Sequence, residues 1–222
     1  LYSDAIRDLG LRYALRTSDP LDRNIRITAS GRPSVPGYAT QRETTDQLLK
    51  QHTAPALHEI VHYGRSSTFY LAAPGQLPPE AEDRPRSHFQ FVDTFDDEVK
   101  LVDGRKPEPI TGDRPLALEV LLGKEAADQL AVSLGDRFEL HPFWRQDMEP
   151  VAVTVVGFVE PRDYSDPFWF GKNDRFSLES PSWVTYPFWV SEDVMNKTLA
   201  GYLPDMDSSI DTYGFIDIGQ IN

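Results

Sequence analysis

The stretch that decides the fold begins at Leu116 and reads LALEVLLGKEAADQLAVSLGDRFELHPF; after a polar segment, VAVTVVGFV follows at residues 151–159. Apolar residues alternate over residues 116–122, which predicts a strand with one buried face. Small and apolar residues then recur at helical spacing until Gly135, where a left-handed glycine would end the helix. Alternation resumes at residues 138–140, and residues 151–159 are apolar on both faces, as is typical of a central strand. The stretch therefore predicts strand, helix, strand, strand.

This unit resembles part of a known family. EVLLGKEAADQLAVSLGDRFEL followed by VAVTVVGFVEP is similar to the extracytoplasmic core domain of FtsX/MacB-type ABC transporter permeases. VKLVDGRKPEP at residues 99–109 resembles the G-R-x-P turn of that family, and DYSDPFW at residues 163–169 resembles a loop of some members. Gly-Asp and Asp-Gly are common turn chemistry, so the order and spacing of the segments carry the resemblance.

The resemblance implies an α+β fold with mixed sheets, short helices and a MacB-like extracytoplasmic arrangement. We expect about eight strands and about four helices. Residues 110–190 are expected to form a strand-rich subdomain, inserted into a porter-like α/β part made of residues 1–109 and 191–222.

The resemblance also implies a non-catalytic role at the extracytoplasmic face of the cell membrane. There the domain would couple ATPase-driven motion of the membrane helices to the handling of a substrate or a partner protein. Its partners would be a separate ATPase subunit, a second permease copy and an extracytoplasmic protein. No cofactor, metal or catalytic residue is expected.

The amino-acid composition excludes some classes of function without reference to the family resemblance. The 222 residues are 40% hydrophobic and 11% aromatic, which is enough for a buried core. A formal net charge of -13 disfavours binding to nucleic acid or to an anionic lipid surface. No cysteine is present, so disulfides and thiolate metal sites are excluded. The apolar runs are too short to span a bilayer, and any membrane contact would come through flanking helices.

The start of the chain agrees with either of two origins. It begins at Leu1 without a signal peptide, as expected of a loop excised from between membrane helices or of a processed soluble protein. Residues 2–16 form an amphipathic pattern that predicts a helix, which in the permease family would continue a membrane helix outward. A second helix is predicted from Thr40, with Glu43 completing a capping box, to about His52. Further elements are expected as strands at residues 24–28, 183–190 and 213–218, and as a helix over residues 192–199 capped by Ser191.

The run His58-Glu59-Ile60-Val61-His62 has the form of a zinc peptidase motif. On a helix, the two histidines would share one face and the glutamate would activate a bound water. Neighbouring residues favour a strand, on which the histidines would be about 13 Å apart, too far for one metal ion. We therefore expect a partly exposed strand and a nearly unchanged melting temperature in the His62→Ala variant. A secreted zinc metallopeptidase remains the alternative function.

Two acidic segments invite a calcium interpretation. Residues 93–98 lack the glycine and ligand spacing of a calcium loop, which favours a solvated turn. Asp205, Asp207, Ser209 and Asp211 alternate as ligands could. However, Ile210 stands where such a loop needs glycine.

Aromatic residues concentrate between residues 164 and 189, where they include three of the four tryptophans. Such residues can form a ligand or partner surface, for which Phe168, Trp169 and Phe170 are the candidates. They can equally be a loop folded onto its own core, with Trp183 and Trp189 inside. A free-standing binding module that uses this surface is the third function considered. Motifs for nucleotide hydrolysis and for acyl transfer are absent from the sequence.

Overall fold

A computed structural model describes residues 2–32, 35–54, 56–80, 84–108, 116–145, 147–170, 175–176, 184–217 and 219. Its elements are α1 (Tyr2–Thr17), α2 (Pro20–Arg23), β1 (Ile25–Gly31), α3 (Val35–Thr53), β2 (Leu57–Ser66), β3 (Phe69–Ala72), β4 (Arg86–Val92), α4 (Phe95–Glu98), β5 (Val99–Gly104), β6 (Ala117–Gly123), α5 (Lys124–Gln129), β7 (Arg137–Pro142), β8 (Val151–Pro161), η1 (Pro167–Trp169), β9 (Thr185–Trp189), η3 (Val194–Leu199), α6 (Ala200–Tyr202) and β10 (Ser208–Ile216). The ten strands form one mixed sheet, which confirms the α+β fold class.

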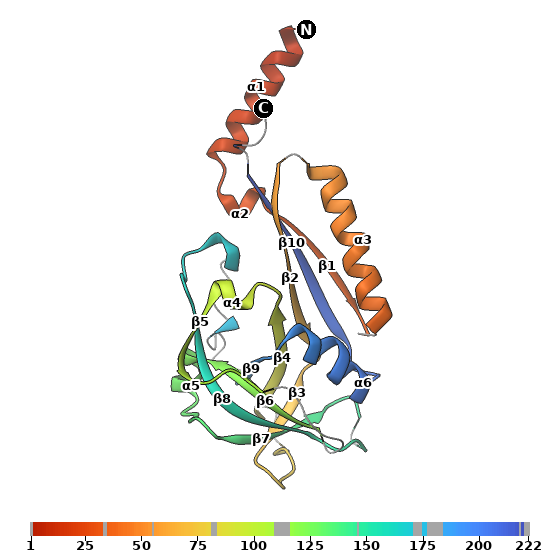
Figure 1. Ribbon diagram of the computed structural model, residues 1–222, viewed down its shortest axis with the longest axis vertical. Coiled ribbons are helices and arrows are strands. Elements are labelled where there is room, and N and C mark those ends of the chain that lie inside the picture. Colours follow the sequence, from red (N-terminus) through yellow and green to blue (C-terminus); the bar gives the residue numbers. More distant parts are fainter. Residues whose placement is uncertain are drawn as a thin grey trace.

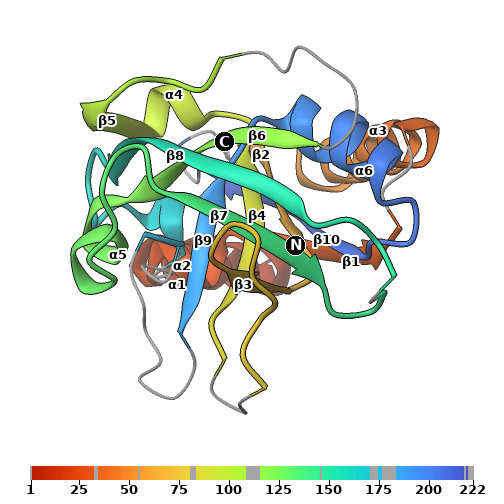
Figure 2. The same ribbon diagram turned by 90° about the horizontal axis from the view of Figure 1, so that it is seen from below.

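Six of the strands close into a barrel (Figures 1 and 2). The hydrogen-bonded order is β4-β3-β7-β8-β6-β9, and β9 pairs back to β4. Of the six strand pairings that close the barrel, β6 with β8 and β4 with β9 are parallel. The other four pairings are antiparallel. Closure removes open sheet edges from this part of the molecule. Its core includes the fully buried Phe89, Val120 and Leu140.

A three-stranded ribbon extends from the barrel. β10 lies between β1 and β2, and β2 joins the barrel by pairing Tyr63 with Val92 of β4. Helix α3 covers one face of this ribbon (Figure 1). There the buried Leu49 packs over Gly214, where an added side-chain carbon would lie 3.2 Å from the leucine.

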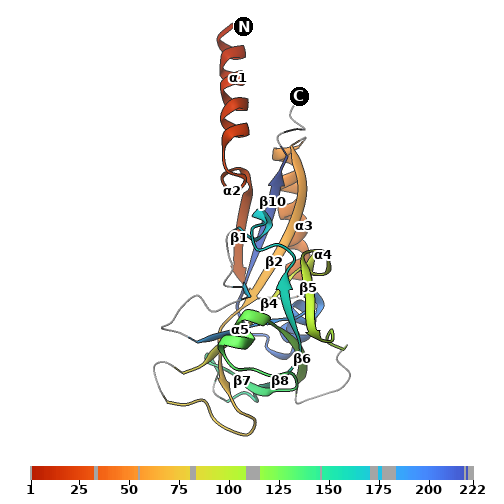
Figure 3. The same ribbon diagram turned by 90° about the vertical axis from the view of Figure 1, so that its left-hand side faces the viewer.

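Helix α1 stands away from the body of the molecule, and both ends of the chain lie at this same end (Figures 1 and 3). Ile6, Leu9 and Tyr13 are all more than half exposed on it. In the part of the chain that the structure describes, no helix combines the length and the apolarity needed to cross a bilayer.

The predicted order strand, helix, strand, strand is confirmed as β6, α5, β7 and β8. The predicted end of the helix is wrong, because α5 ends at Gln129 rather than near Gly135. Ala131 takes the left-handed conformation, and Gly135 with φ of 88° lies in a separate turn closed by the Asp136 carboxylate. The capping box at Thr40 is also wrong. Helix α3 begins at Val35, and the Thr40 hydroxyl donates to the Pro36 carbonyl instead.

Residues 110–190 supply β6, β7, β8 and β9 to the barrel, while β3 and β4 come from before them. β5 from the same earlier segment pairs with β8. The division of the chain into an inserted subdomain and a surrounding part stays a prediction.

Candidate functional site

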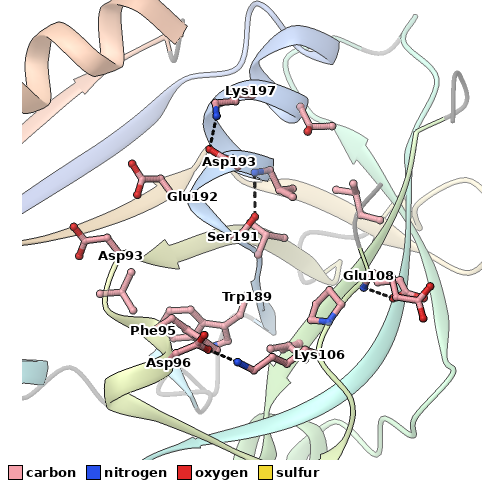
Figure 4. Close-up of a pocket in the computed structure, with 18 of the residues that line it drawn as sticks. Asp93, Phe95, Asp96, Lys106, Glu108, Trp189, Ser191, Glu192, Asp193 and Lys197 are labelled. Atoms are coloured by element: carbon pink, nitrogen blue, oxygen red, sulfur yellow. Dashed lines mark hydrogen bonds and ion pairs between the residues drawn. The ribbon is translucent and has the colours of Figure 1, made fainter. Parts of the chain in front are cut away.

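A cavity of about 670 Å³ lies where the parallel strands β4 and β9 end (Figure 4). We call it the β4–β9 cavity. Parallel neighbours end at the same edge of a sheet, so the segments that follow them face one another. One wall is the turn at residues 93–97 after β4, and the opposite wall is the helical segment at residues 191–198 after β9. β6 and residues 106–108 complete the lining.

Local hydrogen bonds hold both walls in place. After β4, the Asp93 N–H donates to the His62 carbonyl at 3.1 Å, which holds the start of this turn against β2. After β9, the Ser191 hydroxyl accepts from the Val194 N–H at 3.2 Å. This confirms Ser191 as the cap of the predicted helix. That helix contains a π-helical segment, η3. π-Helices are rare in proteins, and those that occur are often found at functional sites.

His62 is enclosed between two carboxylates beside the cavity. Its Nδ1 lies 2.7 Å from Asp93 and its Nε2 lies 2.8 Å from Asp46 of α3, and its side chain is only 2% exposed. Through these two contacts His62 joins α3 to the cavity wall.

Two further side chains of α3 reach the cavity wall. Arg42 donates to Asp93 at 2.9 Å and to Glu192 at 2.5 Å, and the Tyr38 hydroxyl donates to Glu192 at 2.8 Å. Burial, followed by the charge of Glu192, raises the pKa of Tyr38 far above its usual value. Asp93 and Glu192 both line the cavity. α3 is thus bonded to both walls through one connected set of polar and charged side chains, Tyr38, Arg42, Asp46, His62, Asp93 and Glu192, which we call the His62–Arg42 network.

The residues of the zinc motif do not lie on a helix, the element that would place both histidines on one face. Residues 58–62 lie on strand β2, which confirms the predicted strand. His58 is exposed, whereas both nitrogens of His62 are bonded to carboxylates. The expected partly exposed strand is confirmed, with His58 and Glu59 exposed, while His62 is buried. Among the described residues, no three side chains of the metal-binding types are grouped to hold an ion.

The acidic segments are also used differently from a calcium loop. Asp205 pairs with Arg145 at 2.8 Å, while Asp211 is buried on β10 and accepts from the Thr28 hydroxyl at 2.5 Å. The solvated turn expected at residues 93–98 is wrong at Asp93, whose side chain is only 12% exposed.

The candidate aromatic surface lies apart from the β4–β9 cavity. Phe168 and Trp169 are buried in a second core cluster, and Phe170 is partly buried with its ring 4.3 Å from that of Tyr213. Trp189 is buried in the same cluster, as expected, and Trp183 lies outside the described residues. A binding role for the three candidates stays a prediction, in which Phe170 offers the accessible ring.

Phe168 also lines a smaller cavity of about 270 Å³. Glu59, Glu98 and Asp166 surround it, and burial, followed by the charge of Asp166, raises the pKa of Glu98.

The sequence did not indicate the β4–β9 cavity or the His62–Arg42 network. One signal was present, since Tyr38, Arg42 and Asp46 are spaced by four residues and so share one face of a helix. Their partners lie on three other segments.

Comparison with known proteins gives little further information. No family model matches the chain, and no curated protein matches it. Among solved structures, the chain is similar to "a domain of a putative Permease protein" from Porphyromonas gingivalis, with a TM-score of 0.36 and 12% identity. The similarity covers 90% of this chain and 77% of that one. It is weak, so the chain's own sequence and geometry remain the basis for a function.

Proposed function

We propose that this chain is a non-catalytic extracytoplasmic domain of an ABC transporter permease subunit. It would couple ATPase-driven motion of membrane helices to the handling of a substrate or partner protein outside the membrane. A separate ATPase subunit and a second permease copy would be its partners in the full-length protein.

The observation that carries the proposal is where the family-like segments lie. The three longer segments correspond to β5 with the turn after it, to β6-α5-β7, and to β8. β8 pairs with β5, β6 and β7. Segments separated in sequence thus form one continuous part of the sheet around β8, as expected if their order and spacing reflect a shared structural unit.

The position of the chain ends supports the same proposal. Helix α1 stands away from the body, and both ends lie at one end of the molecule (Figure 3). A domain inserted between two membrane helices must enter and leave on one side. Motion of those helices would reach the barrel through the ribbon of β1, β10 and β2, which connects this end to β4.

Labelling of single cysteines in the full-length protein tests the proposed location. The chain has no cysteine, so a cysteine placed at Leu77, which is 83% exposed, gives a unique label site in these residues. In an otherwise cysteine-free background, Leu77→Cys should react with a membrane-impermeant maleimide in cells whose cell membrane is intact. Any cell wall or outer membrane must first be removed or permeabilised, so that the reagent reaches the outer face of the cell membrane. Ala127→Cys is the matched control, because Ala127 is 1% exposed and should react only after denaturation.

Two results would contradict the proposal: labelling of Leu77→Cys only after lysis, or recovery of the full-length protein outside the membrane fraction. A permease subunit should also retain an ATPase subunit when purified in mild detergent. A preparation that holds one equivalent of zinc and cleaves peptides would favour the metallopeptidase instead.

A further inference from the structure

We propose that the β4–β9 cavity binds a small organic cation with an apolar body, that is, an amine carrying an aromatic or branched aliphatic group. The inference concerns the contents of this cavity and goes beyond the proposed transporter role. It stands or falls independently of that role, because it is tested on the isolated chain.

The size and floor of the cavity suit a small apolar group. Its volume of about 670 Å³ lies within the range typical of small-molecule sites. Most of its apolar lining comes from strands β4, β6 and β9 and the segments after them: Val92, Phe95, Leu118, Leu121, Trp189, Val190 and Val194. An aromatic or branched aliphatic body would bury its surface against these side chains.

The charged side chains that line the cavity favour a positively charged ligand. Seven carboxylates and two lysines line the cavity. Five of the carboxylates already have close cationic partners: Asp96 with Lys106, Asp193 with Lys197, Glu119 with Arg105, and Asp93 and Glu192 with Arg42. The ion pairs of the described residues leave Asp97 without a cation. Glu108 lies 3.7 Å from an Arg105 that is already held by Glu119. The remaining negative charge attracts an amine and repels an anion.

Two polar groups next to the cavity are closed off from it. The indole N–H of Trp189 and the hydroxyl of Thr94 are buried without a partner among the described residues, and neither atom is accessible to solvent. A ligand in the cavity would therefore be held by the apolar lining and by the carboxylates rather than by these two donors.

Three matched phenylalanine derivatives test the proposal. The probe is phenylalaninamide, used at a pH where its amine is protonated; N-acetylphenylalaninamide is the neutral control and N-acetylphenylalanine the anionic one. Amide chemical shifts of the labelled chain report binding. Phenylalaninamide should bind saturably with a dissociation constant on the order of 1 mM, given its few heavy atoms. The shifts should centre on Val190, Val194 and the Trp189 indole signal.

Variants separate the cavity from the acidic surface in general. Asp97→Asn combined with Glu108→Gln should weaken phenylalaninamide binding by about fivefold, as expected for exposed ion pairs. Both side chains are exposed, so packing is preserved. Glu80→Gln combined with Glu149→Gln removes the same charge elsewhere on the surface and should leave binding unchanged. Thr198→Trp, which fills the cavity from its wall, should abolish binding.

Several outcomes would overturn the proposal. These are equal binding of the cationic and anionic probes, no saturable binding of phenylalaninamide, shifts spread over the acidic surface, or equal weakening by the two double variants. The proposal would also be overturned if the Thr198→Trp variant gave the spectrum of the native fold and still bound phenylalaninamide as tightly as the wild-type chain.

Discussion

At the scale of single residues, His62 is the centre of the interactions that hold α3 against the cavity. Its ring is buried and contacts two carboxylates that come from different elements. Removing a buried hydrogen-bond partner leaves the groups that it bonded unsatisfied, which costs far more than the loss of a surface contact. His62 therefore acts as a structural cross-link, a role that its place in a zinc-like motif conceals.

We predict that His62→Ala lowers the free energy of unfolding by about 3 kcal/mol, because Asp46 and Asp93 lose their shared partner. His58→Ala is the matched control. It alters an exposed histidine of the same strand and should change stability by about 0.5 kcal/mol or less. Urea unfolding of both variants measures the difference. Equal stability of the two variants would show that His62 has no such role, and would restore the expectation made from the sequence.

A second buried histidine makes stability depend on pH. Burial, followed by the charge of Arg65, lowers the pKa of His88 well below its ordinary value. As pH falls through about 6.5, the unfolded chain takes up a proton on this imidazole and the folded chain does not. The unfolded state then binds more protons, so the stability present above this pH is lost as the pH falls.

We therefore predict that His88→Gln flattens the dependence of stability on pH. As the pH falls below about 6.5, the wild-type chain should lose stability through this group with a slope of at most about 1.4 kcal/mol per pH unit, and the variant should not. Urea unfolding at a series of pH values provides the measurement. Parallel curves for the two proteins would mean that His88 is protonated in the folded state.

At the scale of elements, the sequence predicted periodicity well and boundaries poorly. Alternation at residues 116–122 identified β6 because side chains on a strand alternate between faces. The helix after it was predicted too long because Leu130 and Leu134 continue the helical spacing. In the structure, Val132 N–H bonds to the Ala127 carbonyl and the chain turns at Ala131. This local cap, with alanine rather than glycine in the left-handed position, leaves no mark on the apolar period of the sequence.

The last residue of β5 shows how closely neighbouring strands can approach. Gly104 has a φ of 77°, and a side-chain carbon there would lie 2.2 Å from the Val156 carbonyl oxygen of β8. Glycine thus meets two requirements at this position, a left-handed backbone and direct contact with the neighbouring strand.

Comparison with Gly135 separates these two requirements. Gly135 has a φ of 88° but no atom within 4 Å of an added side-chain carbon. We predict that Gly135→Ala costs about 1 kcal/mol from backbone strain alone. Gly104→Ala should cost at least about 2 kcal/mol more, because β5 must also move away from β8. Similar losses on thermal unfolding would argue against a close β5–β8 contact.

At the scale of the whole molecule, closure of the barrel is the feature that the sequence could not predict. The alternation of apolar residues can identify each strand. It does not indicate that β4 and β9 pair with each other. The cavity was missed for the same reason, since its two walls follow these two strands. His62, Asp46, Asp93 and Glu192 come together only once the barrel and α3 are in place.

We predict that a chain ending at residue 184, without β9 and β10, does not unfold cooperatively. It lacks the strand that joins β4 to β6 and the strand between β1 and β2. Urea titration followed by circular dichroism should give a broad, shallow change, with the full-length chain as the control. A sharp transition in the shortened chain would show that the barrel does not need β9.

The parallel pairing of β4 with β9 has a consequence for synthesis on the ribosome. β4 ends at residue 92 and β9 begins at residue 185. At about 5–20 residues per second, the ribosome needs roughly 5–20 s to add the chain between them. During that interval β4 has been made and its partner has not, so its edge and the apolar residues meant for the barrel interior are open to other chains. A chaperone that holds nascent chains would be needed most in this interval.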